Sequence, residues 1–143
     1  MADIFHQFPI KAPRAKVFEA VATPAGLDAW WTKRATGEPI EGAKYTLWFG
    51  TEHDWRAVVV RCEPDAVFEL RMTVAMDDWR GARVSFQLDE QDGVTQVRFQ
   101  HTGWPAVSEH YCISSFCWAM YLRLLKRYVE FGEVVPYEDR LDV

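Results

Sequence analysis

The apolar and polar positions of residues 108–131 repeat with the period of an α-helix. Positions three and four apart form one inward face, which consists of Tyr111, Ser115, Trp118, Leu122, Leu125 and Val129. At about 1.5 Å per residue such a helix is about 36 Å long, enough to cross a small domain. Because serine interrupts the apolar face in its N-terminal half, we expect the sheet behind the helix to be tightly packed at one end and hollow at the other.

Shorter runs that alternate apolar with polar residues predict β-strands along much of the remaining chain. The alternation is clearest in residues 68–76, where Glu69, Arg71 and Thr73 form the polar phase. Turn residues separate the runs, and Asp92-Gly93 is typical of a tight hairpin. The expected strands cover residues 4–10, 45–49, 55–62, 68–76, 84–88 and 97–101. Since one hairpin follows another, the sheet should be antiparallel.

Two short helices are expected between the first strand and the rest of the sheet. Pro13 suits the first turn of one helix, and Thr23 with Pro24 suits the start of the other. Their inward residues would be Val17, Phe18, Val21, Leu27, Trp30 and Trp31. Gly132 suits the cap that ends the long helix, and the tail over residues 133–143 is expected to pack loosely or to serve an interface.

The chain has 143 residues, which suffices for one domain, residues 1–143, whose core needs neither disulfides nor metal. Seven Trp, nine Phe and five Tyr should dominate its interior. A formal net charge of −5 without a basic run argues against nucleic acid or an anionic membrane surface as partner. Three cysteines without a CxxC pair, and the lack of an apolar stretch of about 18 residues, favour a cytoplasmic protein without membrane insertion. We expect no cofactor and no metal.

The order of several short motifs is informative. They are Ile10-Lys11-Ala12-Pro13 before Val17-Phe18, Leu27 before Trp30-Trp31, His101-Thr102-Gly103-Trp104, and then Trp118, Tyr121-Leu122, Leu125, Tyr128-Val129-Glu130 and Gly132. In these motifs the chain resembles the START-related superfamily, also called SRPBCC, and within it the family of the activator of heat-shock protein 90 ATPase. The resemblance implies an α+β helix-grip fold, in which a curved antiparallel sheet of six to seven strands grips the long C-terminal helix. It also implies a cavity between helix and sheet for an apolar or amphipathic small molecule.

The residues that we expect to line this cavity are mostly aromatic, although any single ring could equally fill the core. They are Trp30, Trp31, Tyr45, Trp55, Met72, Phe86, Phe99, His101, Tyr111, Ser115 and Trp118. His101 lies in the inward phase of its strand and is the candidate catalytic residue, because a neutral buried imidazole can orient a ligand or act as a base. The alternative is a structural histidine that bonds to the backbone. Ser114 and Ser115 lack the context of a catalytic nucleophile and would instead shape the cavity.

Other polar residues lack the spacing of a known site. His53 with Asp54, and His110 with Glu109, do not have the spacing of zinc or iron ligands and are expected to be solvated. Asp77-Asp78 are adjacent in a loop rather than opposed across a bond, which gives no support to glycosidase chemistry.

These observations favour a protein that binds a small hydrophobic or aromatic molecule rather than an enzyme. Two alternatives remain open. One is a cyclase or aromatase that uses the same cavity, with His101 or Tyr111 moving protons; the other is a co-factor that contacts a chaperone, which only the resemblance implies. The superfamily also includes lipid-binding and stress-response proteins. The apolar residues Val134 to Tyr137 in the tail make a homodimer plausible.

Overall fold

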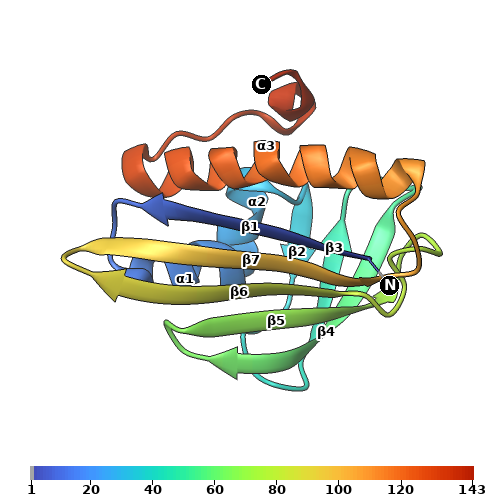
Figure 1. Ribbon diagram of the computed structural model, residues 1–143, viewed down its shortest axis with the longest axis horizontal. Helices are drawn as coiled ribbons and strands as arrows, with labels where there is room; N and C mark the ends of the chain where they lie inside the picture. Colours follow the sequence, from blue (N-terminus) through green and yellow to red (C-terminus); the bar gives the residue numbers. More distant parts are fainter. Residues whose placement is uncertain (1) are drawn as a thin grey trace.

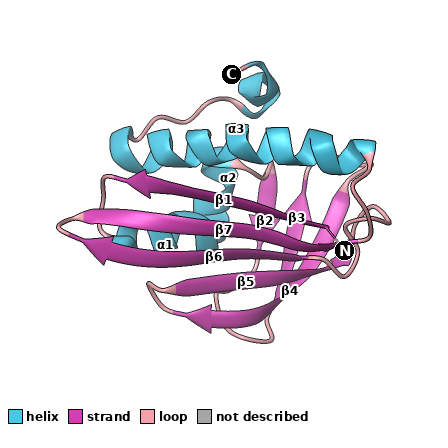
Figure 2. Cartoon of the chain, viewed as in Figure 1, coloured by secondary structure: helices cyan, strands magenta, loops and turns pink. Residues whose placement is uncertain are grey.

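In the computed structural model, which describes residues 2–143, seven β-strands form one antiparallel sheet. Their order in the sheet is β1-β7-β6-β5-β4-β3-β2, so the N-terminal strand pairs with the last one. The strands are β1 (Ala2–Ile10), β2 (Arg34–Thr36), β3 (Lys44–Trp48), β4 (Asp54–Glu63), β5 (Val67–Val74), β6 (Arg83–Gln91) and β7 (Val94–Trp104). Figures 1 and 2 show that the sheet curls, so that β2 and β3 stand at a steep angle to β1 and β7.

Three α-helices and one short 3-10 helix complete the described part of the chain. They are α1 (Arg14–Ala22), α2 (Pro24–Trp30), α3 (Glu109–Phe131) and η1 (Tyr137–Asp142). The long helix α3 lies along the sheet, and α1 and α2 contact both α3 and strands of the sheet (Figure 1). This arrangement confirms the predicted α+β helix-grip fold. The short strand β2 was not predicted, because three residues are too few to show an alternation.

Local sequence signals set the ends of α3. Ser108 caps the N-terminus, where its hydroxyl oxygen accepts a hydrogen bond from the Tyr111 N–H at 3.1 Å. Glu109 in the first turn complements the helix dipole. Gly132 ends the helix in the left-handed conformation at φ 69°, and its N–H donates to the carbonyl of Tyr128.

The inward face of α3 differs from the predicted one in its N-terminal half. Trp118, Leu122, Leu125 and Val129 are buried, as their spacing indicates. Nearer the N-terminus the buried residue is Ser114, whereas Tyr111 and Ser115 are only half-buried. Both serines lie about one turn from Trp118, so helical periodicity alone does not decide which of them faces inward.

The C-terminal tail is anchored rather than loose. Arg140 is only 3% exposed, and its guanidinium donates hydrogen bonds to the carbonyls of Asp28, Thr32 and Val135 at 2.8, 3.2 and 3.0 Å. Tyr137 donates its hydroxyl to the carbonyl of Phe49 at 3.3 Å. These bonds bring η1 back over α3 to the end of α2. None of the helices within residues 2–143 has the length and apolar character needed to span a membrane.

Candidate ligand-binding cavity

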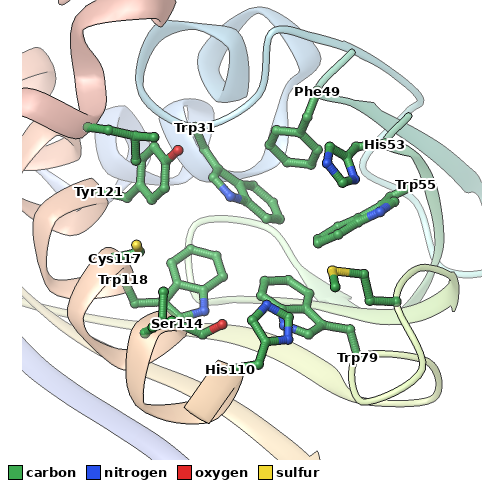
Figure 3. A pocket seen from close by; sticks show the side chains of 13 residues that line it. Trp31, Phe49, His53, Trp55, Trp79, His110, Ser114, Cys117, Trp118 and Tyr121 are labelled. Atoms are coloured by element: carbon green, nitrogen blue, oxygen red, sulfur yellow. The ribbon is translucent and has the colours of Figure 1, made fainter. Parts of the chain in front are cut away.

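An open cavity of about 470 Å³ lies between the N-terminal half of α3 and one end of the sheet. Its walls are mainly aromatic rings, which come from the end of α2, from β4 and the residue after β3, from the β5–β6 loop and from α3. The rings belong to Trp31, Phe49, Trp55, Trp79, Trp118 and Tyr121 (Figure 3). The cavity therefore lies beside the part of α3 where serines interrupt the apolar face.

Few polar side chains reach this space. The remaining lining residues are His53, Met76, His110, Ile113, Ser114, Cys117 and Leu141. In Figure 3, Ser114 and His110 on α3 lie across the cavity from Phe49 and His53. Burial raises the pKa of the Cys117 thiol, so this residue contributes a neutral group. None of the lining residues is Lys, Arg, Asp or Glu.

The aromatic walls hold one another in place. The ring centroids of Trp31 and Trp118 lie 5.0 Å apart, and those of Trp55 and Trp79 lie 4.8 Å apart. Phe49 contacts Trp55 edge-on at 5.4 Å. Such pairs are worth about 0.5–1.5 kcal/mol each beyond the area that they bury. The cavity is therefore a largely preformed space with rigid walls.

His101 lies behind this wall and does not line the cavity. The side chain has no solvent exposure, and its Nδ1 accepts a hydrogen bond from the Trp118 indole N–H at 3.0 Å. Burial, with a smaller contribution from the nearby His110, lowers the pKa of His101 to about 3. The imidazole is therefore neutral near pH 7, as expected, but its partner is a tryptophan side chain rather than a ligand or the backbone.

Three buried N–H groups in and below the cavity floor have no hydrogen-bond partner among the described residues. They belong to Trp79, Trp104 and the Nε2 of His101, which carries the proton because Nδ1 accepts. The ring centroid of His101 lies 4.3 Å from that of Trp79 and 4.8 Å from that of Trp104. These unpaired N–H groups therefore belong to aromatic rings that pack against one another.

The structure brings only some of the sequence-predicted residues to the cavity. Trp31, Trp55 and Trp118 line it. Trp30, Tyr45, Met72, Phe86 and Phe99 are at most 1% exposed and fill the core instead.

Hydrogen bonds and the rotation of α3 explain why four of the predicted residues do not line the cavity. Trp30 donates its indole N–H to the carbonyl of Ala20, and Tyr45 donates its hydroxyl to that of Ala22. Tyr111 donates its hydroxyl to the carbonyl of Asp3 at the edge strand β1. Ser115 follows the lining residue Ser114 on α3, so its side chain points in a different direction around the helix.

Sequence reasoning missed Trp79, which forms part of the floor. It lies in the polar loop between β5 and β6, where neither helical nor strand periodicity applies, yet it is only 6% exposed. A tryptophan inside an otherwise polar turn was the available signal.

His110 was also missed as a cavity residue, because its partner is distant in sequence. Its Nδ1 lies 2.8 and 2.9 Å from the two carboxylate oxygens of Asp78, which precedes it by 32 residues. Within residues 2–143, no group of three or more His, Cys, Asp or Glu side chains could hold a metal ion.

The sequence model of the activator of Hsp90 ATPase homolog 1-like protein matches residues 11–130. The chain belongs to this family. The match confirms the resemblance to the START-related superfamily and covers the chain from the end of β1 almost to the end of α3. No curated protein sequence matches the chain.

Several solved structures share the fold of this chain. The Aha1 dimer from Colwellia psychrerythraea is 29% identical, with a TM-score of 0.84 over 93% of this chain and 99% of that one. SSP2350 from Staphylococcus saprophyticus is 21% identical, with a TM-score of 0.77 over 94% of this chain and 96% of that one. CalU16 from Micromonospora echinospora is also 21% identical, with a TM-score of 0.74 over 96% and 83%. For SSP2350 and CalU16, which are each 21% identical, the likeness shows the fold alone.

Proposed function

We propose that this protein binds a small, neutral, aromatic molecule in the cavity beside α3. The observation that carries the proposal is an unfilled space of about 470 Å³ with preformed aromatic walls. Ligand pockets commonly have volumes of about 300–1,000 Å³ and combine apolar walls with a few polar groups. A core that needed these rings only for packing would have closed on them.

The chemistry of the lining residues favours a flat, uncharged ligand over a fatty acid or another anion. Indole and phenyl walls stack well on a planar ring. No Lys or Arg among the lining residues is available to pair with a carboxylate, and burial of an unpaired charge is costly. His110, His53 and the hydroxyl of Ser114 are available for one or two polar substituents. Burial of apolar ligand area is worth about 25 cal/mol per Å² before the ordering costs.

The test compares two serine substitutions on neighbouring positions of α3. The neutral fluorescent probe 1-aminoanthracene should bind the unmodified protein with an enhanced, blue-shifted emission. Ser114→Leu places an isobutyl group at the cavity wall and should weaken binding by about tenfold or more, because it removes volume. Ser115→Leu adds the same group outside the wall and should leave the affinity within about twofold.

Either of two results would contradict the proposal. One is the absence of saturable binding of the probe to the unmodified protein. The other is an equal loss of affinity in the two leucine variants, which would place the binding site elsewhere.

We also propose that the protein forms a homodimer in the cytoplasm. The dimeric relative from Colwellia psychrerythraea supports this state. So does Phe116, whose side chain is 78% exposed on α3. A chaperone partner is supported only by the description of the family. Light scattering coupled to size exclusion tests the dimer, and a monomer mass of 16.6 kDa at all concentrations would contradict it.

A further inference from the structure

The carboxylate of Asp78 and the imidazole of His110 form an isolated pair at the cavity. Asp78 lies in the loop between β5 and β6, and His110 lies in the first turn of α3. The side chains are only 23% and 30% exposed, whereas both partners of the Arg98–Asp89 pair are more than half exposed. The Asp78–His110 pair is therefore partly withdrawn from solvent and opens on the aromatic cavity through His110.

The hydrogen bond fixes which ring nitrogen of His110 is free. An ionised carboxylate can only accept, so Nδ1 carries the proton that is shared with Asp78. In the neutral ring, Nε2 then has the lone pair, and no group within residues 2–143 donates to it. His110 thus presents an available base on a ring that borders the cavity.

Two aromatic rings lie beside the imidazole of His110. The ring of Trp79 is stacked with the imidazole, with 6.3 Å between the ring centroids and an interplanar angle of 26°. The ring of Trp104 meets the imidazole edge-on, with 5.6 Å between the centroids. The carboxylate of Asp78 at Nδ1 supplies a counter-charge for the imidazolium that forms when Nε2 takes up a proton.

We propose that Asp78 and His110 form a proton-transfer site that acts on the molecule bound in the cavity. This inference rests on the proposed function. The substrate class is a neutral aromatic compound with an acidic C–H, such as one next to a carbonyl. His110 is the catalytic residue and Asp78 is its positioning residue.

The reaction is a proton shift that needs no co-reactant. The C–H bond breaks and its proton forms a bond to Nε2 of His110, while the electron pair moves onto the carbonyl oxygen as an enolate. The imidazolium, held by Asp78, returns the proton to another atom of the ligand, so that the net change is an isomerisation. Ser114 lies one helical turn from His110 and lines the same cavity, where its hydroxyl can donate to the enolate oxygen.

The test uses 5-nitrobenzisoxazole, a flat neutral compound that reports on a base in an apolar site. Removal of its C3 proton breaks the N–O bond, converts the C=N bond to a nitrile and releases a coloured cyanonitrophenolate. We expect saturable turnover, with kcat lower by about 100-fold in His110→Gln. Asp78→Asn should lower kcat by roughly tenfold and leave KM unchanged, because the imidazolium loses its counter-charge.

Asp77→Asn is the matched control. Asp77 lies in the same loop and bears the same charge, but its side chain is 97% exposed and pairs with Arg80. This variant should keep the turnover of the unmodified protein. The ¹⁵N shifts of the imidazole should show a single Nδ1–H tautomer in the unmodified protein and in Asp77→Asn, and a mixture in Asp78→Asn. If the pair is purely structural, Asp78→Asn changes the tautomer but leaves kcat unchanged, which would contradict the proposal.

Displacement of 1-aminoanthracene by 5-nitrobenzisoxazole distinguishes failure of the proton-transfer proposal from failure of the binding proposal. If the compound displaces the probe and His110→Gln turns it over as fast as the unmodified protein, the proton-transfer site is wrong and the binding proposal stands. If neither compound binds saturably, both proposals are wrong. Retained binding of 1-aminoanthracene by His110→Gln shows that the variant is folded.

Discussion

The indole N–H of Trp118 and the Nδ1 of His101 are joined by a hydrogen bond of 3.0 Å at a place that no water reaches. One residue lies on α3 and the other on β7, so this bond links the helix directly to the sheet. Trp118 faces the cavity on its other side. The bond therefore fixes one wall of the cavity from behind.

The buried imidazole should make the stability of the fold depend on pH. The pKa of His101 is about 3 in the folded state and about 6.5 in the unfolded chain, so only the unfolded chain gains this proton between these values. The free energy of unfolding should therefore fall as the pH falls below about 6.5, by up to about 1.4 kcal/mol per pH unit. Urea unfolding from pH 7 to pH 4 should show that the stability advantage over His101→Gln shrinks across this window. An advantage that is constant with pH would contradict this assignment.

Removal of the indole donor should destabilise the protein by more than its packing loss. Trp118→Phe keeps an aromatic ring but leaves Nδ1 of His101 buried without a donor, which costs about 1–3 kcal/mol. The double variant with His101→Leu should recover part of that loss, because both polar partners are then gone. Denaturant unfolding of the two single variants and the double variant measures the coupling, and strict additivity would show that the bond contributes nothing.

The hydrogen bonds of Arg140 should hold the C-terminal tail in place beside the cavity. Arg140→Ala removes the hydrogen bonds to Asp28, Thr32 and Val135, and it frees η1 together with the lining residue Leu141. Chymotrypsin should then cleave after Tyr137 at least about tenfold faster, since local opening exposes that bond. Arg123→Ala, at an exposed position of α3, is the control and should be cleaved at the original rate. Equal cleavage rates would mean that the tail is held by other contacts.

Gly26 should tolerate no side chain, because α1 and α2 touch there. A Cβ at this position would lie 2.4 Å from the carbonyl oxygen of Glu19 and 2.7 Å from the Cα of Ala20. Gly26→Ala should force the helices apart, weaken the bond from Trp30 to Ala20, and cost about 1–3 kcal/mol of stability. Thermal unfolding of this variant beside Ala25→Ser, at an exposed neighbouring position, gives the comparison. A similar small change in both variants would show that the helices can adjust.

The sequence predicted the regular elements well, because their periodicity reflects which residues face the core. The long helix begins at its Ser108 cap and ends at Gly132, as its sequence indicates, and the predicted hairpin at Asp92-Gly93 connects β6 and β7. The family resemblance supplied the curvature of the sheet and the grip on α3, which alternation of apolar residues does not reveal.

The residues of the cavity were harder to predict, because several of them lie in segments without a periodic pattern. Trp79 and Asp78 lie in a loop, and Leu141 lies in a tail whose path is set by Arg140 far from any periodic pattern. The pairing of Asp78 with His110 depends on how the β5–β6 loop meets the start of α3. Inward strand residues such as Phe86 satisfy the alternation equally well whether they fill the core or border a space.

The pairing of β1 with β7 also sets an order of assembly. Each strand from β2 to β7 pairs with its neighbour in sequence, so this part of the sheet can form hairpin by hairpin as the polypeptide is synthesised. The first strand, in contrast, contacts residues about 90 positions later, such as Gln96 opposite Pro9, and contacts of long sequence separation are slow to form. Of the seven strands, the one that is synthesised first is therefore the one that must wait longest for its partner.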